Sequence, residues 1–374
     1  MKKRVALFGA TGSIGKSTLD VIRQGKDVFE LVLLSSHTNT EGLLTLAAEF
    51  PTAILALSGR TQGPEAIPYF GSQGLLTAIA ACGGDIAVNG IAGAAGLQPS
   101  IAALNAGMDL ALANKETMVM AGPLVLALAQ EKKRRILPVD SEHAAIFNLL
   151  EAHGRDQLDA ILLTASGGPF RNYSPEQLSA VSPQDALAHP TWSMGPKISI
   201  DSSTLANKGL EVIEAARLFA LPPENITVVV HPQSIVHSMI RFTDGTIYAQ
   251  LSYPDMRLPI QEALSYPARG SWSWNALHFD DLNLEFKKPD TATFPMLPLA
   301  YEALRSGPPY TVAYNAANEI AVTAFLEQRI PFLAIPRVVA HVLDRPWTGA
   351  LQLESILALD SEARSAAAAC IKAI

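Results

Sequence analysis

The chain has 374 residues, which favours two or three domains rather than one. Hydrophobic residues make up 49% and charged residues 17% of the sequence, so an intrinsically disordered chain is excluded. The net charge of −7 argues against a nucleic-acid-binding protein, which usually carries a basic excess. Two cysteines, Cys82 and Cys370, are too few for a disulfide framework or a cysteine zinc site.

Neither a targeting segment nor a membrane span is expected. The basic start of the chain resembles that of a signal peptide, but the apolar run Val5–Ala10 is too short and leads into a glycine loop. The most apolar longer stretch, Leu97–Val119, contains several charged and amide side chains. We therefore expect a cytoplasmic protein with no membrane partner and no nucleic-acid partner.

The first 140 residues alternate short apolar runs with stretches of helical spacing. Short non-alternating strands separated by helices are typical of a parallel sheet that is covered on both faces. The sequence therefore predicts an α/β fold whose residues 1–140 form a doubly wound, Rossmann-like nucleotide-binding domain. The predicted strands are Val5–Phe8, Leu31–Leu34, Ala53–Leu57, Ile86–Val88, Leu110–Ala113 and Ile136–Val139.

The pattern changes after Asp140, and residues 141–265 are expected to form an α+β catalytic domain. A helix is predicted from about Ser202–Thr204 to Phe219, and Asp244-Gly245 is a good hairpin turn between two strands. Residues 266–298 are rich in Pro, Trp and Asp and are interpreted as a linker. Residues 299–374 are expected to form a C-terminal helical domain, with Asn315 as a helix cap.

A glycine loop, Gly9–Gly15, follows the first predicted strand and opens a helix. Its glycines allow a tight turn and the close approach of backbone N–H groups to a pyrophosphate, and the helix N-terminus favours an anion. An ordinary tight strand-to-helix turn is the alternative. The second strand ends without the acid that NAD enzymes use for the ribose hydroxyl, and His37 and Asn39 there suit a 2′-phosphate. These residues, with Arg60 after the third strand, favour NADP.

Two acids, Asp140 and Glu142, end the sixth strand, where ligands bind in α/β sheets. They suit a hard divalent cation, but the pair alone is better explained by helix capping. A second cluster, Ser202–Glu211, places hydroxyl, amide and ammonium groups at an expected helix start, which is typical of a phosphate cradle. Glu211 would repel a bound phosphate unless it shared a metal ion with Asp140 and Glu142. The alternative interpretation of this cluster is a capped surface helix.

Lys115 and Trp192 each leave two interpretations open, whereas two histidines are given one. Lys115, after the fifth strand, either contacts cofactor and substrate or is a solvated lysine at a helix start. Trp192, between prolines, belongs either to a lid that excludes water or to a packed core. His231 and His237, on or near strands, are interpreted as scaffold residues.

Taken together, these motifs resemble the 1-deoxy-D-xylulose 5-phosphate reductoisomerase family, the NADPH enzymes of non-mevalonate isoprenoid biosynthesis. The resemblance extends over residues 9 to 319, which is nearly the whole chain. It is carried by eight stretches in the same order: Gly9–Gly15, Leu112–Glu116, Leu137–Glu142, Ser166–Phe170, His189–Gly195, Ser202–Glu211, His231–Ser238 and Asn315–Glu319.

The resemblance implies a homodimer with an NADPH domain, a catalytic domain and a C-terminal helical bundle. It implies that Mg²⁺, Mn²⁺ or Co²⁺ is bound by Asp140, Glu142 and Glu211. It implies a flap at Trp192, and Lys115, Glu142, Glu211 and His189 as catalytic residues. The implied cofactor-binding residues are Thr11, Gly12, Ser13, Ile14, Asn114, Glu116 and Gly195. The implied substrate-binding residues are Lys115, Ser141, Glu142, Ser166, His189, Ser202, Asn207, Lys208 and Glu211.

One position departs from the family pattern. Many members carry a lysine in a Gly-Lys-Asn stretch after the second strand, where it helps to select NADP, and this chain has Thr38 there. NADP selectivity is therefore expected to rest on other groups, such as His37 or Arg60.

The expected reaction converts 1-deoxy-D-xylulose 5-phosphate to 2-C-methyl-D-erythritol 4-phosphate by rearrangement and reduction. A metal held by three carboxylates can polarise the ketose, and Lys115 can stabilise developing negative charge. The alternatives are a semialdehyde or homoserine dehydrogenase and a non-catalytic NADP-binding regulator. The dehydrogenases need neither three convergent carboxylates nor a phosphate cradle, and intact acids at all three positions argue against a regulator.

Overall fold

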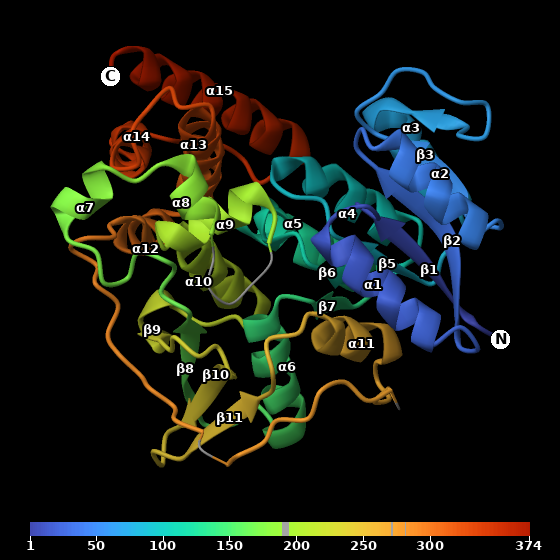
Figure 1. Ribbon diagram of the computed structural model, residues 1–374, viewed down its shortest axis with the longest axis horizontal. Coiled ribbons are helices and arrows are strands. Elements are labelled where there is room, and N and C mark those ends of the chain that lie inside the picture. The colour runs from blue at the N-terminus through green and yellow to red at the C-terminus, as the bar shows by residue number, and fades with distance from the viewer. Residues whose placement is uncertain (189–193, 271, 281) are drawn as a thin grey trace. The chain divides into compact units, whose positions relative to one another are not determined.

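The structure is a computed structural model that describes residues 1–188, 194–270, 272–280 and 282–374 (Figure 1). The chain forms two compact units, each assembled from separate segments. Unit 1 comprises Met1–Thr117, Val125–Ala144 and Asp255–Ala276. Unit 2 comprises Met118–Leu124, Ala145–Pro254 and Leu277–Ile374. Because unit 2 takes residues from both the expected catalytic and the expected helical segments, the domain boundaries at 140, 265 and 298 stay a prediction.

Unit 1 contains a seven-stranded parallel sheet in the order β4-β3-β2-β1-β5-β6-β7. The predicted doubly wound α/β sheet is thereby confirmed. The strand order reverses between β1 and β5, and in such sheets this switch point is where ligands bind. The strands are β1 Lys3–Phe8, β2 Phe29–Ser36, β3 Ile54–Leu57, β4 Tyr69–Phe70, β5 Ile86–Asn89, β6 Asp109–Leu112 and β7 Ile136–Pro138.

Helices connect consecutive strands of this sheet except β3 and β4, which are joined without a helix (Figure 1). The long helix α5 carries a kink at Ala121, just before Pro123, and residues Met118–Leu124 around the kink belong to unit 2. The helices are α1 Ser13–Gln24, α2 Thr40–Glu49, α3 Gly71–Ala81, η1 Ala94–Gly96, α4 Leu97–Asn105, α5 Lys115–Lys132 and α11 Arg257–Ser265.

Unit 2 contains a four-stranded mixed sheet in the order β11-β10-β8-β9. Strand β8 pairs parallel with β9 and antiparallel with β10, so the predicted α+β character is confirmed. The hairpin at Asp244-Gly245 is also confirmed, and Gly245 adopts the left-handed φ of +86° that this turn requires. The strands are β8 Leu158–Ala165, β9 Ile226–Val230, β10 Val236–Phe242 and β11 Ile247–Leu251.

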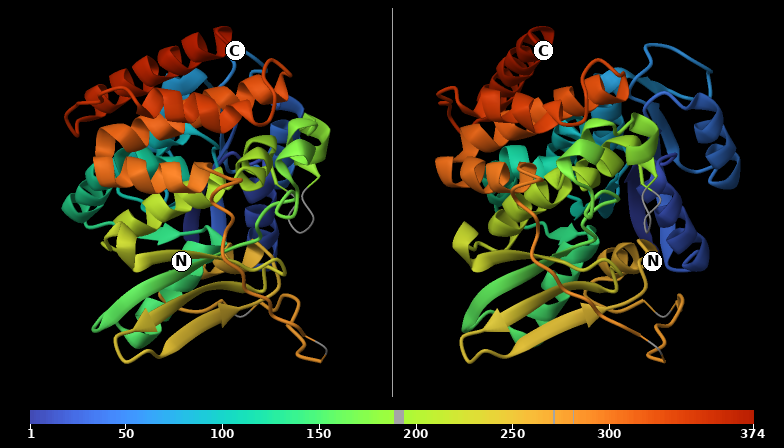
Figure 2. Two further views of the ribbon diagram at one scale, coloured as in Figure 1. Left: turned by 90° about the vertical axis from the view of Figure 1, so that its left-hand side faces the viewer. Right: turned by 60° about the vertical axis from the view of Figure 1, so that its left-hand side comes forward.

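The C-terminal part of unit 2 is helical, as predicted. Helix α13 is the centre of this part and packs against α12, α14 and α15 (Figure 2). Twelve of its residues are buried, so its stability comes from packing on several sides. The remaining helices are α6 Ser141–His153, α7 Pro175–Ser179, α8 Pro183–Leu187, α9 Pro196–Ser203, α10 Ala206–Leu218, η2 Pro223–Asn225, α12 Met296–Ser306, α13 Pro308–Leu326, α14 Ala334–Leu343 and α15 Leu353–Lys372.

Two predicted helix positions are wrong. The helix expected to start near Ser202 is two helices, because Gly195-Pro196 starts α9 and Leu205, at φ +63°, separates it from α10. Ser202 and Ser203 therefore end α9 rather than begin α10. Asn315 is not a cap but a buried residue inside α13, which begins at Pro308 after Gly307.

The described part of residues 266–298 contains no named helix or strand before α12 begins at Met296. The chain passes from unit 1 to unit 2 within this stretch, between Ala276 and Leu277. Within the described residues, none of the helices combines the length and the apolar composition that a membrane crossing needs.

Candidate active site

A cavity of about 500 Å³ lies in unit 1 at the carboxyl ends of the strands. Its lining includes Gly9 and Gly12 of the glycine loop after β1, and Gly90 to Ala92 after β5, which places it at the switch point of the sheet. A cavity at this position in a doubly wound sheet is the usual binding site of a dinucleotide.

The glycine loop has the close backbone approaches that its sequence predicts. Gly9 has a φ of +78°, and a Cβ there would lie 2.9 Å from the carbonyl oxygen of Gly90. A Cβ on Gly15 would lie 2.4 Å from the carbonyl oxygens of Gly9 and Ala10. Helix α1 starts after Gly12 without a side-chain cap, so the helix N-terminus faces the loop with backbone groups suited to an anion.

Several polar side chains line this cavity. Thr11, expected at the pyrophosphate, lines it, and so do His37, Thr38 and Asn39, which follow the second strand where the ribose end was expected. His37 Nδ1 lies 3.1 Å from Ser58 Oγ, whereas Asn39 accepts a 2.9 Å hydrogen bond from Gly42 N and caps α2. Arg60 is exposed and does not line the cavity.

Lining residues that were not assigned to the cofactor from the sequence include Ser35, Ser36, Ser58 and Gln98. Ser36 Oγ lies 2.8 Å from Thr11 Oγ1, which joins the glycine loop to the end of β2. The three serines follow or end predicted strands, so their position at the carboxyl edge was a usable signal. Ser13 and Ile14, by contrast, begin α1 and are not among the lining residues.

Asn114 joins this cavity to the start of helix α5. Its Nδ2 donates to the carbonyl oxygens of Ile91 and Gly93 and to Glu116 Oε2, at 2.8, 2.9 and 2.8 Å. Its Oδ1 accepts from the backbone N–H of Thr117 and caps the helix. Asn114 therefore fixes the loop after β5 against the residues that precede Lys115 and Glu116.

Lys115 is buried rather than solvated. Its side chain is 8% exposed, and its Nζ lies 2.9 Å from Asp140 Oδ2, on a side chain that is 10% exposed. An ammonium group is almost never this buried unless it is paired, so the interpretation as a solvated lysine at a helix start is wrong.

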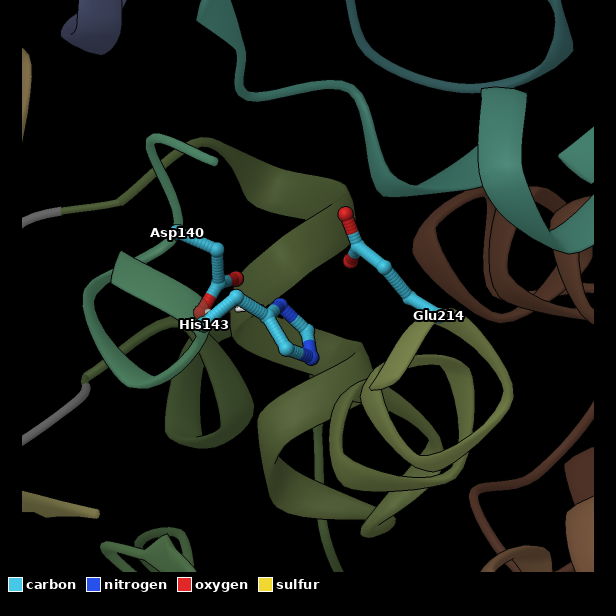
Figure 3. A group of neighbouring side chains, drawn as sticks. All are labelled: Asp140, His143 and Glu214. Atoms are coloured by element: carbon cyan, nitrogen blue, oxygen red, sulfur yellow. Dashed lines mark ion pairs between the residues drawn. The ribbon is translucent and has the colours of Figure 1, made fainter. Parts of the chain in front are cut away.

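Asp140 and Glu142 also meet at the start of helix α6. The backbone N–H of Glu142 donates to Asp140 Oδ1 at 3.3 Å, and Ser141 Oγ donates to Glu142 Oε2 at 2.6 Å. The buried His143 lies 3.7 Å from Asp140, Nδ1 to Oδ1 (Figure 3). Asp140 thus caps the helix, as the alternative interpretation held, and it still directs one oxygen toward Lys115.

In unit 2, the residues of the predicted phosphate cradle lie on two chain segments that are in contact. Gly168 has a φ of +70°, and a Cβ there would lie 2.6 Å from the carbonyl oxygen of Ser202. This contact holds the Ser166 loop against the end of α9, where Ser202 is buried. Gly168 N donates to Ser166 Oγ at 3.3 Å, which orients that hydroxyl.

Helix α10 adds the charged groups of the same cluster. Asn207 Nδ2 and Lys208 Nζ both donate to the carboxylate of Glu211, and Lys208 and Glu211 are almost fully buried. A capped surface helix is therefore excluded, because its Lys and Glu would be solvated. In each unit, a buried lysine is paired with one of the acids that were expected to bind metal.

The structure describes only some of the remaining residues that were singled out from the sequence. Gly195 caps α9, whereas His189 and Trp192 lie outside the described residues. His231 Nδ1 lies 2.8 Å from the carbonyl oxygen of Glu285, and its Nε2 accepts from Ile235 N. His237 Nε2 lies 2.8 Å from Ser252 Oγ. These contacts support the interpretation of both histidines as scaffold.

Family models of 1-deoxy-D-xylulose 5-phosphate reductoisomerase match three parts of the chain. The model of the enzyme matches residues 5–122, the C-terminal-domain model of the same enzyme matches residues 136–219, and a further DXP reductoisomerase C-terminal-domain model matches residues 251–366. Curated relatives of that name are 46% identical in Clostridium perfringens, over 97% of this chain and 98% of the relative, and 48% identical in Treponema denticola, over 93% and 91%.

Solved structures show the same likeness over the full length. A DOX-P reductoisomerase crystallised with NADPH, fosmidomycin and magnesium is 40% identical, with a TM-score of 0.92 over 99% of this chain and 98% of the other. The reductoisomerase of Zymomonas mobilis, in complex with NADPH, is 40% identical, with a TM-score of 0.90 over the whole of both chains.

Proposed function

The chain belongs to the 1-deoxy-D-xylulose 5-phosphate reductoisomerase family, and from this premise we propose how its own residues carry out the reaction. It is an enzyme that uses NADPH and a divalent metal ion to convert 1-deoxy-D-xylulose 5-phosphate to 2-C-methyl-D-erythritol 4-phosphate. The single observation that carries this function is the full-length match to the family, from both sequence and structure.

NADPH binds in the cavity at the switch point of unit 1. The backbone of Thr11, Gly12, Ser13 and Ile14 holds the pyrophosphate at the start of α1. His37, Thr38 and Asn39 line the end where the 2′-phosphate binds. Asn114, Glu116 and Gly195 complete the cofactor site, Asn114 chiefly by fixing the loop after β5. The bound cofactor supplies the hydride for the reduction.

Asp140, Glu142 and Glu211 are the metal ligands in this proposal. Their donor set fits Mg²⁺ or Mn²⁺, because hard divalent cations prefer carboxylate oxygens. The pairing of Asp140 with Lys115 and of Glu211 with Lys208 supports the proposal, since each acid lies beside a cationic group. A bound divalent ion supplies the charge that polarises the substrate's oxygens.

A metal ion held by Asp140 and Glu211 would weaken the pairing of these acids with Lys115 and Lys208. A carboxylate that coordinates a cation attracts its lysine less, so Lys115 and Lys208 can turn to the substrate. Lys208 then holds the phosphate with Ser166, Ser202 and Asn207, which fixes the non-reacting end. Lys115 stabilises the negative charge that develops on the ketose oxygens, and Ser141 and His189 complete the substrate site.

The proposal also covers the substrate class, the location and assembly of the protein, the flap and the roles of the domains. The substrate is a small sugar phosphate, and the protein is a cytoplasmic homodimer that binds neither nucleic acid nor membrane. From the family resemblance we also propose that Trp192, which lies outside the described residues, belongs to a flap at the substrate site. Residues 1–140, 141–265, 266–298 and 299–374 serve as the cofactor domain, catalytic domain, linker and helical domain. The family resemblance supports the dimer and the flap, and the absence of a basic excess supports the lack of a nucleic-acid partner.

The assignment of Glu211 is tested by substitution with glutamine. Glu211→Gln removes the charge but keeps the size of the side chain, so kcat should fall by roughly a hundredfold or more while NADPH still binds. Glu302→Gln, an exposed glutamate on α12, is the matched control. Steady-state turnover and cofactor fluorescence titration measure the two effects. Equal loss of turnover and NADPH binding would show that Glu211 is structural instead.

A further inference from the structure

Three of the residues that we assign to the substrate phosphate lie on two consecutive helices of unit 2. Ser202 lies at the end of α9, whereas Asn207 and Lys208 lie in the first turn of α10. Between the helices, Leu205 has a left-handed φ of +63°, so the regular helix is interrupted there. The two helix ends must be held at a fixed distance if groups from both are to bind one phosphate.

Helix α13 contacts the end of α9 through a buried hydrogen bond. Asn318 Nδ2 donates to Asp201 Oδ1 at 2.7 Å, and both side chains are buried. The other carboxylate oxygen of Asp201 accepts from Lys197 Nζ, also at 2.7 Å. Because Asp201 directly precedes Ser202, the hydrogen bond from Asn318 holds the last turn of α9 beside α13.

This hydrogen bond explains why an amide occupies the buried position 318. Within the part of the chain that the structure describes, the side-chain oxygen of Asn318 has no hydrogen-bond partner. Burial of a polar atom without a partner costs stability, and a leucine of similar size would avoid that cost. The gain from an asparagine here is therefore the hydrogen bond that its nitrogen donates to Asp201.

The same face of α13 contacts α10. Tyr314 lies four residues before Asn318, which is about one helical turn, and is fully buried. Its hydroxyl donates to the Met296 carbonyl oxygen at 3.1 Å, and a Cβ on Gly209 would lie 2.7 Å from that hydroxyl. Glycine at this position lets α10 pack directly on Tyr314, one residue after Lys208. One face of α13 thus contacts both helices that carry the phosphate-binding groups.

We propose that Asn318 is a positioning residue for the substrate phosphate: through Asp201 it holds the Ser202 hydroxyl at a fixed distance from Lys208, so that both groups bind one phosphate. This inference rests on the proposed function. All the residues involved belong to unit 2. Displacement of the end of α9 would weaken binding of the phosphate, because a hydrogen bond to a charged group depends on its geometry.

The first test compares Asn318→Leu with Asn315→Leu. Both replace a fully buried asparagine of α13 by an apolar side chain of similar size, but Asn315 donates to Glu319 Oε1 of its own helix, at 3.0 Å, rather than to α9. Asn318→Leu should raise KM for 1-deoxy-D-xylulose 5-phosphate by roughly tenfold and change kcat by less than about twofold. Asn315→Leu should leave KM unchanged, whatever its melting temperature. An equal rise of KM in both variants would overturn the inference.

Wild-type turnover in the same assay separates this inference from the proposed function. No turnover of 1-deoxy-D-xylulose 5-phosphate by the wild type contradicts the proposed function itself. Normal wild-type turnover, together with an unchanged KM in Asn318→Leu, contradicts only the positioning role.

An exchange of the two partners distinguishes positioning from a general loss of packing. Asn318→Asp places a second carboxylate against Asp201 and should raise KM. In Asp201→Asn/Asn318→Asp, the amide at position 201 can donate to the new carboxylate and accept from Lys197, so both hydrogen bonds are restored. The double variant should return KM to within about threefold of the wild type. A KM that stays as high as in Asn318→Asp would overturn the inference.

Asp201→Asn alone keeps the inference testable should Asn318→Leu fail to fold. Its amide has one oxygen for two donors, Asn318 and Lys197, so the contact with α13 is weakened and KM should rise by about threefold. Removal of a negative charge near the phosphate would by itself lower KM, so the two effects have opposite signs. A KM at or below that of the wild type would contradict the positioning role.

Discussion

Lys115 Nζ lies 2.9 Å from Asp140 Oδ2, and both side chains are about nine-tenths buried. The two residues follow strands β6 and β7, which are neighbours in the sheet, so the contact is made where two carboxyl ends meet. A buried lysine and carboxylate stabilise each other only as a pair, since removal of one partner leaves an unbalanced charge. This relationship links the expected metal ligand in unit 1 to the expected catalytic cation.

The substitution Asp140→Asn should weaken metal activation. The amide keeps the size of the side chain but lacks the charge that attracts the metal, so the Mg²⁺ concentration for half-maximal activity should rise by about tenfold or more. Turnover against Mg²⁺ concentration measures the effect. Asp85→Asn breaks the exposed Arg4–Asp85 pair of the same unit and is the control. An unchanged Mg²⁺ requirement in Asp140→Asn would mean that this residue only caps helix α6.

The neighbouring serines at the end of α9 provide a test of the phosphate cradle. Ser202→Ala should raise KM for the substrate by about tenfold, the loss of one hydrogen bond to a charged group, with kcat less affected. Ser203 Oγ donates to the Ile200 carbonyl oxygen at 2.7 Å, so Ser203→Ala is a matched control that should leave KM unchanged. With 1-deoxy-D-xylulose, which has no phosphate, the difference between Ser202→Ala and the wild type should disappear. A difference that persists would place Ser202 elsewhere in the site.

The sequence allowed the sheet and the residues of the candidate site to be predicted, because both predictions depend on local pattern. Each predicted strand of unit 1 was a short apolar run, and the glycine loop and acids follow directly after such runs. Strand β4 has only two residues, and helix α3 begins at Gly71 without a capping side chain, so neither gave a pattern to detect.

Other features depended on tertiary contacts that no local pattern contains. The break at Leu205 requires a left-handed backbone at a non-glycine residue, which sequence propensity argues against. Asn315 is a typical capping residue, but packing of α13 among its neighbours buries it. The burial of Lys115 follows only from its pairing with Asp140, which lies 25 positions away along the chain.

The preference for NADPH over NADH should increase in Thr38→Lys. Thr38 lines the cavity that we assign to NADPH, at the position where the family pattern described above has a lysine. An ammonium group there would bind the 2′-phosphate by a charge-assisted hydrogen bond. The ratio of kcat/KM for the two cofactors should rise by about tenfold. Thr61→Lys adds the same charge at an exposed position outside the lining and should leave the ratio unchanged. No change in Thr38→Lys would show that the 2′-phosphate binds away from Thr38.

Tyr301 should make stability depend on alkaline pH. Its hydroxyl donates to the Ile226 carbonyl oxygen at 2.7 Å, and burial raises its pKa to about 12. Because the folded-state pKa lies above the unfolded value of about 10, this stabilisation is complete below pH 10 and is lost as pH rises toward 12, with about 1 kcal/mol lost near pH 11. Urea unfolding of the wild type and Tyr301→Phe at several pH values measures the difference. Parallel pH profiles would contradict the assignment.

The most direct measurement of the central claim is the oxidation of NADPH by the wild-type protein with 1-deoxy-D-xylulose 5-phosphate, with and without Mg²⁺ and with NADH in parallel. We predict oxidation that requires both the substrate and the metal ion, and that is faster with NADPH than with NADH. A folded protein that binds NADPH but oxidises none of it under these conditions would contradict the assignment and favour an NADP-binding regulator.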